Sequence, residues 1–137
     1  MNWTLEVVVV PVSDIDRAKT FYAEGLGFKV DHDTRMSETR RIVQLTPPGS
    51  GCSVVIGTGL SRMVPGSMQS LQLVVRDVRA AREQLLELGV EVGEVQVLGG
   101  PAPRPAGPDE ALNFVGFLTF KDPDGNGWAV QQIDARE

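Results

Sequence analysis

The chain has 137 residues and a formal net charge of −5 at pH 7, with 42% hydrophobic and 23% charged residues, which is typical of one globular domain or two fused half-domains. Its single cysteine, Cys52, and single histidine, His32, exclude an internal disulfide and a zinc site built from several Cys and His residues. The acidic balance and the lack of a long apolar run indicate no nucleic-acid partner and no membrane span, so we expect a cytoplasmic protein.

In the first half, an apolar strand precedes a helix, and three further strands follow. Either Ser13 or Asp14 can cap the helix, because both side chains can accept a hydrogen bond from a first-turn N–H. Ile15, Ala18 and Tyr22 then recur with helical spacing and predict one buried helix face. Residue alternation predicts strands at 4–12, 29–34, 41–46 and 52–58, and we expect Cys52 to be a small buried residue.

The second half repeats this pattern. Residues 71–81 (LQLVVRDVRAA) echo residues 8–18 (VVVPVSDIDRA), so that Asp77 matches Asp14 at an offset of 63 residues. An apolar helical stripe follows Asp77 and ends at Gly89, a residue that suits a helix stop. The second set of predicted strands lies at 70–75, 90–97, 114–120 and 127–133.

The sequence therefore predicts an α+β protein of two βαβββ modules, residues 1–60 and 68–137, within a single domain. One helix can cover only one face of a sheet. We therefore expect the modules to form a curved eight-stranded cleft with the helices outside. The segment 99–113 holds four prolines and is expected to be irregular, either as a surface loop or as a lid over the cleft.

Three motifs resemble those of a known family. Residues 12–18 (VSDIDRA), 26–28 (LGF) and 120–128 (FKDPDGNGW) resemble the opening and closing motifs of the glyoxalase / bleomycin-resistance / extradiol-dioxygenase superfamily, the vicinal oxygen chelate fold. The paired modules agree with this resemblance, which covers nearly the whole chain. It is specific for the fold and not for the reaction. Physically, Asp122–Gly125 is interpreted as a structural turn whose aspartates satisfy local amides.

The resemblance implies a divalent metal in the cleft, held by His, Glu or Gln. The positions that match the family's ligands are Val7, Val55, Ser70 and Ala129, or Gln131 in place of Ala129 if the last turn is shifted. Valine and alanine cannot bind a metal, and serine alone is a poor ligand. We therefore predict that the metal site is lost and that no cofactor is bound, and we interpret His32 as a surface residue.

Alternation along the strands predicts which side chains face the cleft. These candidate ligand-binding residues are Val7, Val9, Gln44, Ser53, Val55, Ser70, Gln72, Ala129 and Gln131. The set is apolar with a few neutral hydrogen-bonding groups, which suits an uncharged organic molecule. Alternatively, the glutamines satisfy one another or bind water. No strong acid or base falls on this face, so no catalytic residue is identified.

Three functions fit these observations. The first is metal-independent binding of a small hydrophobic organic ligand, either to sequester it, as resistance proteins of this fold do, or to promote its reaction by positioning. The second is a divalent-metal-dependent lyase, isomerase or dioxygenase. The third is a module whose purpose is its homodimer interface. We expect a homodimer, because relatives commonly dimerise and strand edges favour pairing.

Overall fold

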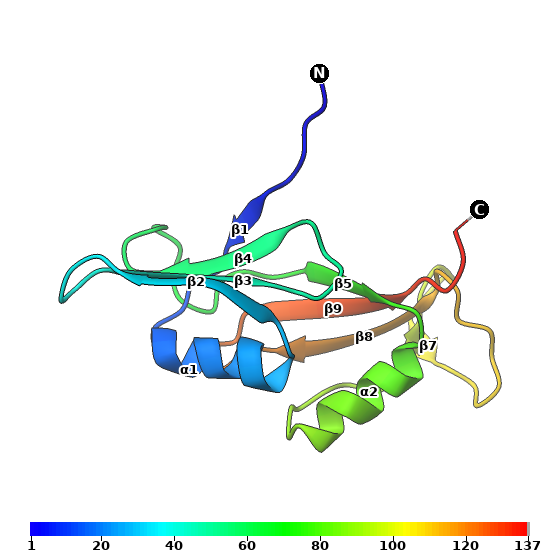
Figure 1. Cartoon of the computed structure of the whole chain (residues 1–137). Helices are drawn as coiled ribbons and strands as arrows, with labels where there is room; N and C mark the ends of the chain where they lie inside the picture. Colours follow the sequence, from blue (N-terminus) through cyan, green and yellow to red (C-terminus); the bar gives the residue numbers. More distant parts are fainter. Residues whose placement is uncertain (137) are drawn as a thin grey trace. The chain divides into compact units, whose positions relative to one another are not determined.

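The computed structural model describes residues 1–136 and divides into two compact units (Figure 1). The first unit comprises residues 1–68 together with the turn at 122–126. The second comprises residues 69–121 together with the described residues from 127 onward. Each unit contains one α-helix and one sheet with both parallel and antiparallel pairs, so the α+β class is confirmed.

The first unit has a four-stranded sheet in the order β1-β4-β3-β2. Strands β1 and β4 pair in parallel, and the other neighbours are antiparallel. Helix α1 is continued by a π-helical turn, η1, and contacts β4. The elements are β1 (Val7–Val9), α1 (Ile15–Thr20), η1 (Phe21–Gly25), β2 (Lys29–Arg35), β3 (Arg41–Thr46) and β4 (Ser53–Gly57).

The second unit has a five-stranded sheet in the order β5-β9-β8-β6-β7. Helix α2 contacts β8 and β9. The segment 99–113 adds a short strand, β7, that the sequence did not predict, and β6 is shorter than the predicted strand at 90–97. The elements are β5 (Leu71–Val75), α2 (Val78–Glu87), β6 (Gln96–Val97), β7 (Arg104–Pro105), β8 (Gly116–Lys121) and β9 (Gly127–Gln132).

The two helices begin in the same way. The Asp14 carboxylate accepts a hydrogen bond from the Arg17 N–H at 3.0 Å, and the Asp77 carboxylate accepts one from the Ala80 N–H at 3.0 Å. Of the two predicted caps of α1, the structure therefore selects Asp14. Helix α2 ends as predicted, because Gly89 adopts a left-handed φ of 77°.

The core of each unit follows the predicted alternation. In the first unit, Val43 and Leu45 of β3 are fully buried, as are Ala18 and Tyr22 from the helical segment. In the second unit, the Trp128 and Val130 side chains of β9 are buried, and the residues between and after them are half-buried. The sequence therefore identified the covered face of each sheet.

Three local expectations need comment. Strand β1 is shorter than the predicted 4–12, because its neighbour β4 begins at Ser53, opposite Val7. Cys52 is half-buried rather than buried, since it precedes β4 instead of lying within it. His32 is exposed on β2, as predicted. Over residues 1–136, no helix is both long and apolar enough to cross a membrane.

Candidate functional site

Five of the predicted site residues lie on one face of the first unit's sheet. The strand register places Val9 beside Val55, and Val55 beside Gln44. It also places Val7 beside Ser53. Side chains of directly paired residues point to the same side of a sheet. These residues therefore form one continuous patch, which we call the first open face. Within it Ser53 and Val55 are buried, at 5% and 8% exposed, whereas Val9 and Gln44 are half-buried.

The polar side chains of the first open face differ in their hydrogen bonding. The Thr46 hydroxyl donates to the Asp31 carboxylate, and the Ser53 hydroxyl lies 2.6 Å from that of Thr46. Ser53 is therefore committed to a chain of hydrogen bonds. Gln44 is half-buried, and its side-chain amide has no hydrogen-bond partner among residues 1–136. Thr46 was not predicted to be a site residue, although it lies two positions after Gln44 on β3 and therefore on the same face of the sheet.

The remaining predicted residues belong to the second unit. Gln72 pairs with Ala129, and Gln131 follows two positions later on the same side of β9; we call this the second open face. The Gln72 amide donates to the Gln131 side-chain oxygen at 2.6 Å. The Gln131 amide in turn donates to the Phe114 carbonyl at 2.8 Å. The alternative that glutamines satisfy one another therefore describes Gln72 and Gln131, whereas Gln44 has no glutamine partner among the described residues.

Ser70 and Phe114 show what residue patterns miss in this unit. Ser70 precedes β5, is exposed and has a left-handed φ of 66°. Phe114 has a φ of 67°, and it supplies the carbonyl that Gln131 binds. Non-glycine residues rarely adopt this backbone conformation, so no sequence signal indicates it.

The residues at the metal-ligand positions implied by the resemblance do not fit a metal. Val7, Val55 and Ala129 lack donor atoms, and Ser70 offers one hydroxyl. Both ends of the Gln131 amide are already hydrogen-bonded within the second unit. No three His, Cys, Asp or Glu side chains of the described chain gather closely enough to hold a metal ion.

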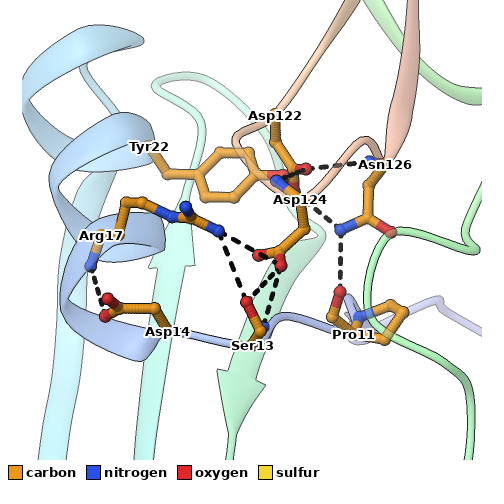
Figure 2. Close-up of polar contacts among 8 residues, drawn as sticks. All are labelled: Pro11, Ser13, Asp14, Arg17, Tyr22, Asp122, Asp124 and Asn126. Atoms are coloured by element: carbon orange, nitrogen blue, oxygen red, sulfur yellow. Dashed lines mark hydrogen bonds and ion pairs between the residues drawn. The ribbon is translucent and has the colours of Figure 1, made fainter.

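The Asp122 carboxylate is buried in the first unit and accepts four hydrogen bonds (Figure 2). The Tyr22 hydroxyl donates to it at 2.6 Å, and the Asn126 side-chain amide donates at 2.8 Å. The backbone N–H groups of Asp124 and Asn126 donate at 3.0 and 2.9 Å. Tyr22 is thus a core residue, as predicted, and Asp122 is structural.

The sequence predicted that the aspartates of this turn satisfy local amides. In the structure they also accept hydrogen bonds from residues far away in the sequence. One Asp124 carboxylate oxygen accepts from the Ser13 N–H at 3.2 Å and the Ser13 hydroxyl at 2.5 Å, with Arg17 at 3.4 Å (Figure 2). The Asn126 amide also donates to the Pro11 carbonyl at 2.8 Å. The turn therefore fixes the chain between β1 and α1. The second Asp124 carboxylate oxygen is buried and has no hydrogen-bond partner within residues 1–136.

The segment 99–113 is tied down within the second unit. Glu110 forms an ion pair with Arg104 and accepts the Gly107 N–H at 3.0 Å, and these hydrogen bonds lower the pKa of Glu110 to about 2. Arg79 of α2 donates to the carbonyls of Gly107 at 2.7 Å and of Glu110 at 3.1 Å. These contacts favour a fixed surface segment over a mobile lid.

Comparisons with known proteins agree with this fold. Uncharacterized protein YetH of Bacillus subtilis (strain 168) is 28% identical over 128 residues, which cover 91% of this chain and 94% of that protein. The crystal structure of TnmS3, an antibiotic binding protein from Streptomyces sp. CB03234, has a TM-score of 0.74 at 32% identity and covers 96% of this chain and 97% of that one.

A glyoxalase/bleomycin resistance protein from the same Streptomyces strain has a TM-score of 0.70 at 34% identity, with coverage of 94% of this chain and 100% of that one. The family model of the Glyoxalase/Bleomycin resistance protein/Dioxygenase superfamily matches residues 4–130. The chain therefore belongs to the glyoxalase/bleomycin resistance protein/dioxygenase superfamily, as its repeated modules and turn motifs had indicated.

Proposed function

We propose that the protein binds and sequesters a small, largely apolar organic molecule without using a metal ion, and that Gln44 hydrogen-bonds to it. The observation that carries this proposal is the half-buried Gln44 amide, which has no partner among the described residues and lies beside Val55. Because this side chain is partly exposed, its amide can exchange water for a ligand carbonyl or hydroxyl group, and one such hydrogen bond contributes about 1 kcal/mol.

The surroundings of Gln44 favour an uncharged ligand. Val9 and Val55 continue the same row of the sheet. Val55 is buried, so the apolar side chain of this row that a bound molecule would contact is the half-buried Val9. None of the nine candidate site residues is titratable. In the turn, both oxygens of the Asp122 carboxylate and one oxygen of the Asp124 carboxylate are hydrogen-bonded. These features support binding more strongly than acid–base turnover.

The comparisons support the same class of function. TnmS3 is described as an antibiotic binding protein, and it is 32% identical to this chain over nearly its full length. Many functions share this fold, so the likeness alone does not assign a ligand. Together with the Gln44 amide, which has no partner among the described residues, and its apolar neighbours, it favours a neutral organic compound over a metabolite that carries several charges.

A pair of matched probes tests the proposal. Fluorene and 9-fluorenone share a ring system, and only fluorenone has a carbonyl group that the Gln44 amide can bind. We expect saturable binding of both and about fivefold tighter binding of fluorenone, the value of one hydrogen bond. Gln44→Leu should abolish this preference, whereas Gln84→Leu, on the exposed side of α2, should keep it. Absence of saturable binding, or an unchanged preference in Gln44→Leu, would contradict the proposal.

A further inference from the structure

Strand β2 is irregular where it passes Gln44. In the register of β2 and β3, Val30 lies opposite Leu45, and the next paired residue of β2 is His32, which lies opposite Gln44. Asp31 is therefore an extra residue on β2, as in a β-bulge. A bulge changes the direction of the side chains around it, and bulges are frequent next to functional sites. The directions of the side chains at this bulge therefore do not follow from simple alternation along the chain.

The contacts of Asp33 show on which side of the sheet His32 lies. Asp33 lies opposite the fully buried Val43. Its carboxylate accepts a hydrogen bond from the Lys19 side chain of α1 at 2.6 Å, so Asp33 faces the side of the sheet that α1 covers (Figure 1). Neighbouring residues of a strand point to opposite sides. His32 therefore points to the other side of the sheet, as does Gln44, the residue directly opposite it.

His32 extends a row of side chains across the first open face. The register of the sheet sets four residues side by side, namely Val9, Val55, Gln44 and His32. The His32 side chain is exposed, and its imidazole has no hydrogen-bond or ion-pair partner within residues 1–136. The other residue of the bulge, Asp31, accepts a hydrogen bond from the Thr46 hydroxyl. His32 is therefore, after Gln44, the second polar side chain of this row that is available to a ligand.

We propose that the His32 imidazole hydrogen-bonds to a hydroxyl group of the ligand, next to the group that Gln44 binds. This inference rests on the proposed function, because it names a second point of recognition in the same site. A neutral imidazole offers one hydrogen-bond donor and one acceptor, and a glutamine amide offers both kinds of group. The Cβ atoms of directly opposite residues lie about 5 Å apart. The pair therefore suits an uncharged ring compound whose carbonyl and hydroxyl groups lie on the same edge, roughly 5 Å apart.

Binding of two matched probes to the full chain tests the role of His32. The compounds 2-hydroxy-9-fluorenone and 2-methyl-9-fluorenone have the same ring system and carbonyl, and only the first has a hydroxyl group. We expect about fivefold tighter binding of the hydroxy compound, the value of one hydrogen bond. His32→Leu should abolish this preference. Thr34→Val is the matched control and should keep it, since Thr34 lies two positions further along β2, opposite Ile42.

NMR of the imidazole gives a second, direct readout. His32 is the only histidine of the chain, so its ring resonances need no assignment by mutation. We expect them to shift saturably with 2-hydroxy-9-fluorenone and less with 2-methyl-9-fluorenone.

The outcomes separate this inference from the proposed function. His32→Leu should keep the preference for 9-fluorenone over fluorene, because Gln44 carries that preference. If that preference is present, but the hydroxyl group adds no affinity or adds the same affinity in His32→Leu, the role of His32 is overturned and the proposed function stands. If the hydroxyl preference depends on His32 and the carbonyl preference does not depend on Gln44, the role of Gln44 fails instead. Absence of saturable binding of every probe would overturn both.

Discussion

The two units share a common start, whereas their open faces differ. Both helices begin at an aspartate that accepts a hydrogen bond from the N–H three residues later, and both first strands pair in parallel with the last strand of their sheet. On the first open face the Gln44 amide has no hydrogen-bond partner within residues 1–136, whereas on the second Gln131 is bonded at both ends. The repeat therefore preserves what directs the backbone, and each unit satisfies its side chains in its own way.

The buried positions of the helices differ in the same manner. Tyr22 is fully buried in the first unit, and the matching position of the second unit, Leu85, is also buried. A buried hydroxyl needs a partner, whereas leucine does not. Asp122 supplies that partner, which explains why the turn at 122–126 packs with the first unit although it lies between two strands of the second.

The largest expected effect comes from removing the turn's carboxylate. Asp122→Ala leaves the Tyr22 hydroxyl and three N–H donors without their acceptor, so we expect the free energy of unfolding to fall by about 3 kcal/mol or more. Urea denaturation measures this loss of unfolding free energy, with Asp109→Ala, at an exposed position, as the control. Similar losses in the two variants would show that the first unit does not depend on this acceptor.

Removing each helix cap tests what the two units share. Asp14→Ala and Asp77→Ala should each cost about 1 kcal/mol, because each removes one acceptor of equal geometry at a helix start. Hydrogen exchange of the first-turn amides in each helix locates the loss. If only one of the two variants is destabilised, the repeat does not preserve the energetics of the caps.

The glutamines test how the open faces differ. Gln131→Leu leaves the Phe114 carbonyl and the Gln72 amide without their partner, and we expect a loss of about 1 kcal/mol. Gln44→Leu removes no hydrogen bond within the described protein and should leave the unfolding free energy unchanged or raise it. Thermal or urea unfolding of both variants gives the comparison. A large loss in Gln44→Leu would show that this amide serves the fold instead of a ligand.

The smallest expected effect is a pH dependence in each unit. Arg104 lowers the pKa of Glu110 from 4.5 to about 2, and hydrogen bonds from Arg41 hold the pKa of Asp33 well below its usual range. A lowered carboxyl pKa stabilises the fold above the unfolded-state pKa, and this contribution is lost as the pH falls toward the folded-state value. The Glu110 contribution should therefore be complete above about pH 5 and disappear as the pH approaches 2. Since both ion pairs lie at the surface, salt weakens them.

Carboxyl NMR titration measures these pKa values directly. Arg104→Gln should return the Glu110 midpoint toward 4.5 and leave Asp33 unchanged. If Glu110 titrates near 4.5 in the parent protein, the ion pair does not hold the segment 99–113 in solution.

Much of the fold follows from local sequence patterns. Alternation gave β3 its observed bounds, 41–46, and identified the buried side chains of β9. Strand ends were harder to predict, because they depend on where a neighbouring strand begins, as β1 does on β4. Strand β7 arose in a proline-rich segment, where an edge position tolerates the missing N–H of Pro105.

Part of the candidate site could also be predicted from local sequence patterns. Alternation indicated which residues share an open face, because neighbouring side chains on a strand point to opposite sides. It could not show that Ser13 binds Asp124, since nothing local links residues 111 positions apart. Nor could it separate Gln44 from Gln131, whose partner is a carbonyl at an unusual backbone angle.

Binding at Gln44 is tested by following its side-chain amide by NMR while 9-fluorenone is added to the whole protein. We expect the Gln44 amide resonances to shift saturably with 9-fluorenone and less with fluorene. The Gln131 amide resonances should shift little, because that amide keeps its hydrogen bonds. Saturable shifts at Gln131 with none at Gln44, or no binding of either probe, would contradict binding at Gln44.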